Sequence, residues 1–295
     1  MKYGTVTLGQ VEAAINKLGG QKMWDAWLRG EKTVVVDTAR PLFDKRGRRI
    51  SEGLQANVCD PNRDFYLKQP KLDSEADYAN RVMRLHGCLD VNTTGITAEQ
   101  FKAETERLLA LVRGNSQIVN IVNGVHLPVI MPQLTTDDLG TALEQYLEVV
   151  GKSYAKDFPD RKSYNHRKGT LAKEVGIVDG SCHDQLIKLM KQGSVIGIYF
   201  PNSLQGYSIY ADREQMSDLP EGFILSGVDI VIAMAMYPDI LARDWYASGQ
   251  DLAALSWQSV LSLSFRACDV RLVFVFPAYL ASAYDYYSGG LLFLG

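Results

Sequence analysis

The sequence lacks the features that assign many chains to a class at once. No apolar run follows a basic start, so nothing indicates an export signal. No stretch reaches the roughly 20 uninterrupted apolar residues that span a bilayer. The most apolar one, residues 223–236, is broken by Gly227 and Asp229. We therefore expect a soluble, cytoplasmic protein that binds no membrane.

Cysteine pairs are also absent. The chain has four cysteines and no C-x-x-C motif, whereas structural zinc sites usually bring their ligands in such close pairs. Without an export signal, widely separated cysteines indicate free thiols rather than disulfides. No two of the four histidines are spaced i, i+4: His86, His126, His166 and His183. The sequence therefore predicts no metal site.

Common catalytic signatures are missing too. The sequence contains no G-x-x-x-x-G-K-[ST] phosphate loop, no G-x-G-x-x-G motif after a strand and no G-x-S-x-G nucleophile motif. It has no internal repeat and no low-complexity tract. These absences give no support to the common phosphate-loop, dinucleotide-binding and hydrolase classes, and we expect no cofactor.

What the chain does have is the composition of an ordinary globular protein. Of its 295 residues, 46% are hydrophobic and 22% are charged, which is enough apolar surface to bury a core. The formal net charge of -3 gives no general attraction to nucleic acid or anionic membranes. A partner of that kind would need a local basic patch.

Helix signals recur along the chain and are supported by capping residues. Thr7 with Gln10, and Thr97 with Gln100, match the capping box in which two side chains satisfy backbone N–H groups reciprocally. Thr135 is expected to cap a further helix. The apolar spacing in these segments predicts helices over about 7–18, 21–29, 74–86, 97–113, 135–150 and 181–192.

Strand signals are strongest near the carboxyl end. Leu261, Leu263 and Phe265 alternate with serines, and a second alternating run covers 270–276, so the two segments predict a β-hairpin. Shorter apolar runs predict further strands over 32–37, 117–122, 125–131, 195–200 and 291–294.

These elements predict an α+β (or α/β) protein. We expect a mixed sheet covered by helices, with a C-terminal β-hairpin and a small N-terminal helical region. Signals are weakest between residues 38 and 72, where basic and proline-containing turns dominate. We therefore expect a small N-terminal α+β region over 1–72 and a main α/β body with the mixed sheet over 73–295.

The best local candidate for chemistry is the segment 179–184. A short strand over 175–178, a loop and a helix from Ser181 lead to the strand at 195–200, an order compatible with a βαβ unit. Ligands bind such sheets at the carboxyl ends of strands. A helix N-terminus there would favour an anion and lower the pKa of Cys182 toward a reactive thiolate. Asp179, Cys182 and His183 are the candidate catalytic residues.

A simpler interpretation of the same segment is the one we favour. Ser181 is then an N-cap that Asp184 supports, Cys182 is a small packed residue and His183 faces water. Adjacent Cys and His residues on a helix point in different directions, so their neighbourhood in sequence is not itself a catalytic arrangement.

The second candidate is a stretch over 152–173 that is basic and aromatic together. Tyr154, Phe158 and Tyr164 are interleaved with cations, so phosphates and stacked bases would both find partners. We assign anion binding to His166, Arg167 and Lys168, together with Ser181. A solvated connector is the favoured alternative, and nucleic acid is left open without being favoured.

Three stretches resemble an uncharacterised group of bacterial proteins. They are Leu8-Gly9-Gln10-Val11-Glu12-Ala13 running into Gly19-Gly20, Tyr199-Phe200-Pro201-Asn202, and Tyr287-Ser288-Gly289-Gly290 with the residues that follow. The resemblance covers the start, middle and end of the chain. It implies a bacterial origin and brings no activity and no catalytic residue.

Two functional hypotheses follow. The first is a non-catalytic protein that binds a small anionic ligand or a protein partner, which the missing catalytic signatures favour slightly. The second is an enzyme that acts on a small anionic substrate through the strand–loop–helix segment at 179–184, with Cys182 as nucleophile.

Overall fold

The structure is a computed structural model and describes residues 7–33, 40–86, 96–257, 261–268 and 270–295. Its contacts divide the chain into two compact units, Met1–Arg40 and Pro41–Gly295. The boundary expected near residue 72 lies inside the second unit, where Phe43 is fully buried. Most of the strand expected over 32–37 lies outside the described residues.

The described part of the first unit is a pair of short helices, α1 (Leu8–Lys17) and α2 (Gln21–Leu28). The capping box of Thr7 and Gln10 is confirmed, since each side chain bonds the backbone N–H of the other residue. Gly19 and Gly20 turn the chain between the helices with φ angles of 96° and 82°, values that suit glycine. The small N-terminal helical region is therefore confirmed.

The second unit holds the remaining elements. Its described α-helices are α3 (Glu75–His86), α4 (Ala98–Arg113), α5 (Leu139–Asp157), α6 (His183–Gln192), α7 (Ile209–Glu214), α8 (Val228–Met236) and α9 (Pro238–Leu241). Two 3₁₀ helices are also described, η1 (Val119–Asn123) between α4 and the next strand, and η2 (Gln215–Asp218) directly after α7. Among the described residues, no helix combines the length and apolar character needed to cross a bilayer.

The strands form three sheets. The first has the order β1 (Leu127–Met131), β4 (Val195–Phe200), β11 (Leu291–Phe293) and β5 (Phe223–Leu225), and all its pairs are antiparallel. The second has the order β10 (Tyr287–Ser288), β6 (Gly249–Asp251), β8 (Leu261–Cys268), β9 (Arg271–Tyr279) and β2 (Lys162–Asn165). A two-stranded ladder joins β3 (Gly176–Ile177) and β7 (Leu255–Ser256).

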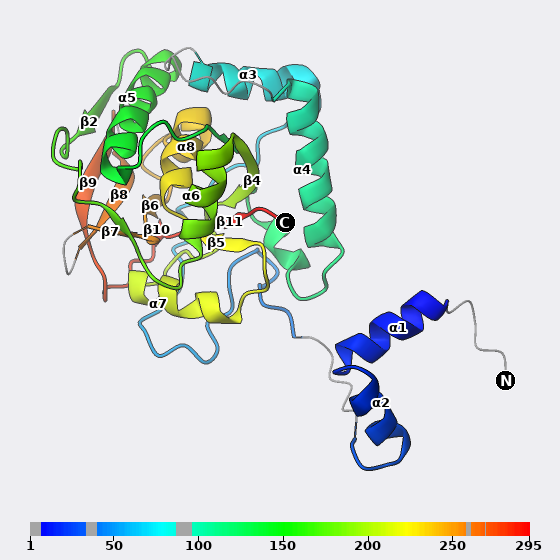
Figure 1. The fold of residues 1–295 in the computed structure, drawn as a ribbon. Helices are drawn as coiled ribbons and strands as arrows, with labels where there is room; N and C mark the ends of the chain where they lie inside the picture. The colour runs from blue at the N-terminus through cyan, green and yellow to red at the C-terminus, as the bar shows by residue number, and fades with distance from the viewer. Residues whose placement is uncertain (1–6, 34–39, 87–95, 258–260, 269) are drawn as a thin grey trace. The chain divides into compact units, whose positions relative to one another are not determined.

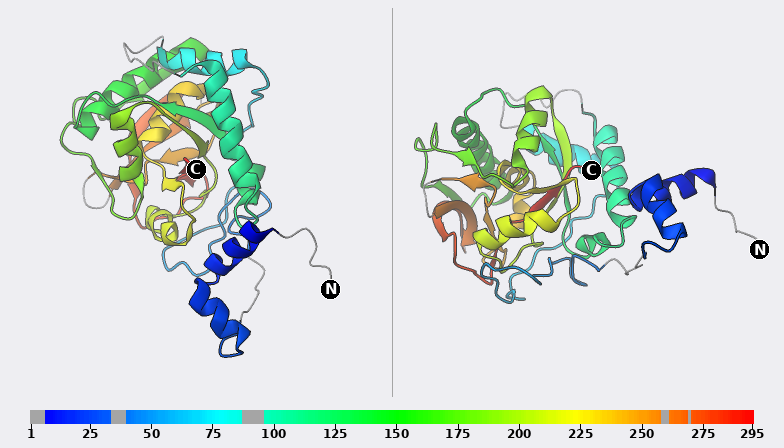
Figure 2. Two further views of the ribbon diagram at one scale, coloured as in Figure 1. Left: turned by 45° about the vertical axis from the view of Figure 1, so that its right-hand side comes forward. Right: turned by 60° about the horizontal axis from the view of Figure 1, so that its bottom comes forward.

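The first sheet separates two hydrophobic cores. Along β4, Ile198 and Phe200 point to the core shared with Leu108 of α4, while Tyr199 points to the core shared with α8. This is the period-two alternation that strands require. Helix α4 therefore covers one face of the sheet and α8 the other (Figures 1 and 2).

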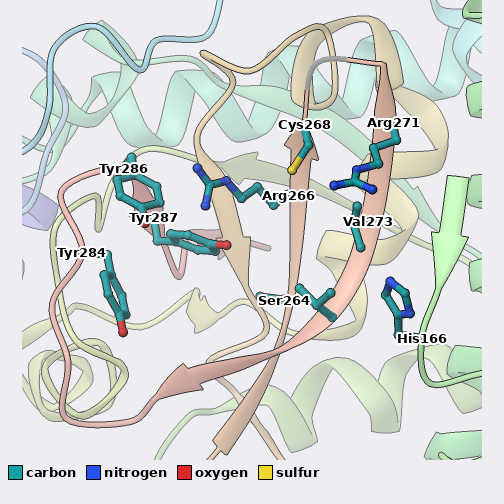
Figure 3. A pocket seen from close by; sticks show the side chains of 10 residues that line it. His166, Ser264, Arg266, Cys268, Arg271, Val273, Tyr284, Tyr286 and Tyr287 are labelled. Atoms are coloured by element: carbon teal, nitrogen blue, oxygen red, sulfur yellow. The ribbon is translucent and has the colours of Figure 1, made fainter. Parts of the chain in front are cut away.

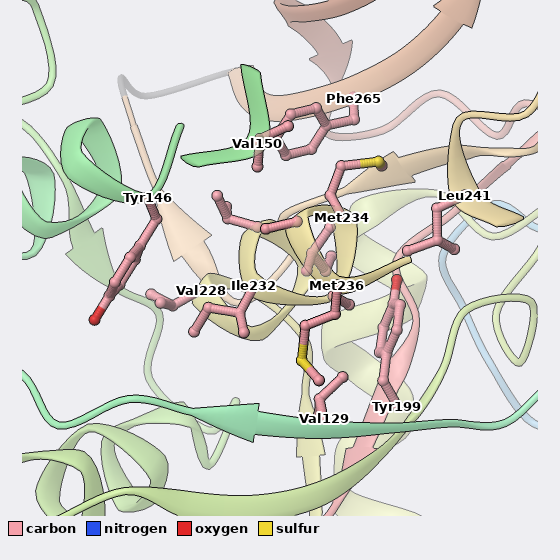
Figure 4. Close-up of a cluster of buried hydrophobic side chains, with 14 of the residues drawn as sticks. Val129, Tyr146, Val150, Tyr199, Val228, Ile232, Met234, Met236, Leu241 and Phe265 are labelled. Atoms are coloured by element: carbon pink, nitrogen blue, oxygen red, sulfur yellow. The ribbon is translucent and has the colours of Figure 1, made fainter. Parts of the chain in front are cut away.

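Helix α8 is buried along its whole length because it lies between the two large sheets. Its Met234 packs beside Phe265 of the second sheet, and its Met236 lies beside Val129 of the first (Figure 4). The two sheets are also joined directly, since the Tyr199 hydroxyl of β4 donates to the Gln250 side chain of β6. The inner face of the second sheet is therefore part of the main core.

The fold class is confirmed as α+β, with a mixed sheet covered by helices. The second sheet is mixed, because β8 pairs antiparallel with β9 while β2 pairs parallel with β9. The β8–β9 pair is the C-terminal hairpin expected from the alternation in the sequence. The capping box at Thr97 and Gln100 is confirmed as well.

Three expectations about elements were wrong. Residues 119–123 form η1 rather than a strand, and asparagine side chains bond the nearby backbone there, as Asn115 does with Gln117. The N-cap of α5 is Asp138 rather than Thr135. The expected βαβ unit does not form among the described strands, because β3 pairs with β7 in a ladder separate from the sheet that holds β4.

Candidate functional site

The outer face of the second sheet carries a set of polar and cationic side chains. Ser264, Arg266 and Cys268 alternate along β8 with core residues such as Phe265. Arg271 lies opposite Cys268 on β9, and Val273 lies opposite Arg266. Because directly paired residues in a sheet point to the same face, all of these side chains lie on the side away from α8.

These side chains line a cavity of about 450 Å³, which we call the outer-sheet cavity. That volume lies in the range that small-molecule sites occupy. Figure 3 shows that its lining is divided: Tyr284, Tyr286 and Tyr287 gather on one side, Arg271 and His166 lie on the other, and Arg266 is between them.

Arg266 is held in place by aromatic rings. Its guanidinium carbon lies 4.2 Å from the ring centre of Trp245, 4.6 Å from that of Tyr286 and 5.9 Å from that of Tyr287. Contacts of a guanidinium with aromatic faces are attractive, and a hydrogen bond between the Arg266 and Tyr287 side chains adds to them. Arg266 is therefore positioned in advance, with donors left for a ligand.

Tyr287 reaches this position because a glycine lies beside it. Tyr287 of β10 pairs with Gly249 of β6 in parallel register. A Cβ atom at residue 249 would lie 2.5 Å from two ring carbons of Tyr287, so the ring occupies the space where any other side chain would begin. We infer that Gly249 leaves room for the Tyr287 ring and so determines the shape of the tyrosine side of the cavity.

The opposite side of the cavity is cationic. Arg271 and His166 are exposed, and the His166 ring stacks on Tyr164 at 6.3 Å between ring centres and 10° between planes. Among the residues that the structure describes, neither Arg266 nor Arg271 forms an ion pair and no carboxylate lines the cavity. The charge of both arginines is thus uncompensated by protein.

One carboxyl group belongs to this face of the sheet but is buried. Asp251 of β6 lies opposite Ser264 on the same side of the sheet and is 2% exposed. Burial raises the pKa of Asp251 to about 8, because water is not there to solvate the ionised form. Burial thus favours the neutral form of this carboxyl over the ionised form.

The arrangement can bind a molecule that has both a negative charge and a ring. Guanidinium groups bond phosphates and carboxylates with two parallel N–H donors, and tyrosine faces stack on planar rings. The groups that line the cavity include no nucleophile paired with a general base in the described hydrogen bonds. Arg266, Arg271 and the three tyrosines are the groups suited to hold such a molecule.

The residues expected to form a catalytic loop lie elsewhere in the fold. Asp179 is exposed, and Ser181 is buried with its hydroxyl donating to the Val178 carbonyl and accepting from the His183 N–H. The N-cap position of α6 belongs to Cys182, which has a left-handed φ of 59° and makes no side-chain capping bond. The N-cap of α6 therefore lies one residue after Ser181, which we had expected at that position.

His183 is fully buried rather than facing water, which corrects the expectation for its side chain. Its Nδ1 bonds the Leu225 carbonyl at 3.1 Å, and its Nε2 accepts from the Val228 N–H at 3.2 Å. Burial lowers the pKa of His183 and favours this neutral form. Both ring nitrogens are therefore engaged by the backbone, and the ring joins α6 to the start of α8.

The three residues of the 152–173 stretch that we expected to bind an anion lie in different surroundings. His166 lines the outer-sheet cavity. The Arg167 guanidinium lies 5.3 Å from the ring centre of Trp257, and Lys168 is exposed in the turn that follows β2. The structure thus brings His166 together with Arg266 and Arg271, and leaves Cys182 and His183 outside this cavity.

Sequence reasoning missed the arginines and the tyrosines of the cavity. The alternation that predicts β8 also places Ser264, Arg266 and Cys268 on one face, and three tyrosines crowd into residues 284–287. Those were the available signals. Their meeting with His166 depends on the parallel pairing of β2 with β9, which no local pattern specifies.

Comparisons with known proteins add no assignment: no family model, no curated protein and no solved structure matches the chain. Within the described part of the chain, no three His, Cys, Asp or Glu side chains gather as metal ligands.

Proposed function

We propose that the protein binds a small organic anion that carries a planar ring, and that the outer-sheet cavity is the binding site. The observation that carries this proposal is the pairing of two uncompensated arginines, Arg266 and Arg271, with a wall of tyrosines around one cavity. This is a form of the ligand-binding hypothesis that the sequence favours.

The charge of the cavity supports an anionic ligand. The chain as a whole is acidic, with a formal net charge of -3, yet the described lining has two arginines and no carboxylate. Arginine interacts with phosphate or carboxylate through its planar fork of donors. A phosphate that reaches Arg271 would also lie near His166, which adds a donor.

The rings of the cavity support a planar group beside the charge. The rings of Tyr284 and Tyr287 are 6.0 Å apart at their centres, and those of Tyr286 and Tyr287 are 5.2 Å apart. These residues are half-buried, so each keeps part of its surface accessible. A ring placed there gains apolar contact and stacking together.

The first test is calorimetric titration with thymidine monophosphate as the probe. Thymidine supplies the ring alone, and deoxyribose phosphate supplies the charge alone. We expect the intact nucleotide to bind more tightly than either part, because the two halves of the cavity act together. Replacing Arg271 with glutamine is expected to weaken nucleotide binding about tenfold, since charge-assisted hydrogen bonds contribute about 1.5–3 kcal/mol.

The matched control is Arg107→Gln. Arg107 lies on α4, is paired with Glu104 on an exposed surface and lines neither side of the cavity. This variant removes the same charge and is expected to bind the nucleotide as the unaltered protein does. Equal weakening by both substitutions, or no binding of the nucleotide at all, would contradict the proposal.

A further inference from the structure

A second cavity, of about 250 Å³, lies in the same unit, and we call it the loop cavity. Its lining includes Arg46, Arg48 and Arg63 together with the rings of Phe65 and Tyr66. The loop cavity therefore combines cations and aromatic rings, as the outer-sheet cavity does.

The two cavities are neighbours. Phe65 lines the loop cavity, Tyr286 lines the outer-sheet cavity, and their ring centres are 5.2 Å apart. Tyr246 lies against the same Phe65, with 5.8 Å between ring centres, and is 51% exposed. The backbone joins the segments as well, because Tyr66 N–H donates to the Tyr246 carbonyl. A band of rings thus runs from one cavity to the other.

The linings of the two cavities are rich in arginine. The described linings contain five arginines, three in the loop cavity and two in the outer-sheet cavity, against one carboxylate, Asp44. Asp44 accepts hydrogen bonds from the backbone N–H groups of Arg46 and Arg48 rather than from their guanidinium groups. Arg46 and Arg63 are exposed, and among the described residues neither forms an ion pair.

The Arg48 guanidinium, unlike those of Arg46 and Arg63, is hydrogen-bonded within the described part of the protein. Its guanidinium donates to the carbonyls of Gln205 and Cys59, each at 2.6 Å, and lies over the Tyr207 ring. These bonds hold the loop that carries residues 44–48 against the body of the unit. Arg48 therefore positions the cavity, while Arg46 and Arg63 present free charge.

We propose that single-stranded nucleic acid binds across both cavities. Its phosphates pair with Arg46, Arg63, Arg266 and Arg271, and its bases stack on the rings that line the band. Proteins that bind single strands combine a cationic groove with aromatic stacking platforms in this way. The inference rests on the proposed function of the outer-sheet cavity and extends it from one nucleotide to a strand.

A second feature supports a single strand over other polyanions. Tyr66, which lines the loop cavity, is 50% exposed, and Tyr246, which lies beside Phe65, is 51% exposed. A ligand with charge alone gains nothing from these rings, whereas each base of an unpaired strand gains contact with them. A duplex keeps its bases stacked on one another, so it offers the rings no face.

The test compares thymidine monophosphate with the thymidylate tetranucleotide by equilibrium titration. We expect the tetranucleotide to bind at least about tenfold more tightly, because base–aromatic stacking adds affinity for each further base. Its affinity should fall with salt, with a slope of about 0.7 in log Kd per log salt for each phosphate neutralised.

Variants of the loop cavity distinguish binding of a strand across both cavities from binding of a mononucleotide in the outer-sheet cavity alone. Arg63→Gln is expected to lower the salt slope for the tetranucleotide by about 0.7 and to leave binding of the mononucleotide unchanged. Arg46→Gln should act in the same way and serves as the second variant if the first does not fold. Arg107→Gln again provides the charge-matched control.

The outcomes are distinguishable. Equal affinity for the mononucleotide and the tetranucleotide would overturn the strand proposal and leave the proposed function standing. Tripolyphosphate binding as tightly as the tetranucleotide would also overturn it, since the rings would then contribute nothing. Failure of the mononucleotide to bind would contradict the proposed function itself.

Discussion

Replacing Gly140 with alanine is expected to destabilise the protein by at least about 3 kcal/mol, the upper part of the range for overpacking a core. A Cβ atom at residue 140 would lie 1.8 Å from the Leu171 carbonyl oxygen and 2.4 Å from its carbon. Those are backbone atoms, which cannot turn aside as a flexible side chain can. Thermal unfolding should show a Tm lower by about 6 °C or more.

The segment around Leu171 is hydrogen-bonded to α5, so it cannot easily move away from a Cβ atom at residue 140. The Leu171 N–H donates to the Glu144 carboxylate at 2.8 Å, and the Lys173 N–H donates to that of Asp138 at 3.0 Å. Leu171 is fully buried. Moving the segment away from residue 140 would therefore break these bonds and open the core.

The matched control is Gly151→Ala in the same helix. There the new Cβ would meet only the Ser163 hydroxyl, at 3.1 Å, and Ser163 is exposed and able to rotate. Alanine is also the better helix former by about 1 kcal/mol. We expect this variant to unfold within about 3 °C of the unaltered protein, the shift that about 1 kcal/mol produces. Similar Tm values for both variants would contradict the packing at Gly140.

Replacing Asp251 with asparagine is expected to stabilise the protein at high pH. The pKa of Asp251 is raised to about 8 by burial, and its Oδ1 has no hydrogen-bond partner among the described residues. The folded state therefore holds a proton that the unfolded chain releases near pH 4. Stability from this group is full below about pH 4 and is lost as the pH rises to about 8 and beyond.

Thermal unfolding at about pH 5 and about pH 9 measures this loss. Asparagine cannot ionise, so the fall in Tm between the two pH values should be smaller for Asp251→Asn, with the variant higher by about 3 °C or more at the upper pH. Some decline should remain, because burial together with Asp251 also raises the pKa of Asp212.

Asp184→Asn is the control for the pH series. Asp184 is exposed on α6, and its hydrogen bond from Lys188 lowers its pKa, which is the opposite direction. Replacing Asp184 should therefore leave the fall in Tm toward high pH unchanged. Parallel Tm curves for Asp251→Asn and the unaltered protein would show that Asp251 is ionised in the fold and would refute the prediction.

Local signals in the sequence were enough to predict the hairpin and the helices α1 to α6, but they did not predict α7, α8 or α9. The capping box at Thr97 and Gln100 gives the start of α4, and the serine alternation gives β8. The order of the sheets could not be predicted in this way. The C-terminal strand β11 lies between β4 and β5, and such pairing depends on contacts between distant segments.

The candidate site likewise combines a residue that the local pattern predicted with residues that it did not. His166 was identified as an anion-binding residue from its basic and aromatic surroundings, and it does line the outer-sheet cavity. The alternation used to predict the first strand of the hairpin reached only Phe265, whereas β8 continues to Cys268 and includes Arg266. Strand ends are set by pairing as well as by local pattern, so the alternation alone did not show that Arg266 and Cys268 continue the strand.

The segment 179–184 illustrates a different limit. Its residue types suit a catalytic loop, but that role required a βαβ unit, and β3 pairs with β7 rather than with the sheet that holds β4. Whether the helix N-terminus at Cys182 points into a ligand site was a matter of tertiary structure. His183 instead bonds two backbone groups of the β5–α8 region.

The most direct test of the account is the protection of Cys268 from alkylation. Cys268 lines the outer-sheet cavity, while Cys182 and Cys59 line neither side of it and are half-buried as well. With saturating thymidine monophosphate, mass spectrometry should show slower alkylation of Cys268 and unchanged alkylation of Cys182 and Cys59. Slower alkylation of Cys182 with Cys268 unaffected would place the anion at 179–184 and contradict the assignment of the cavity.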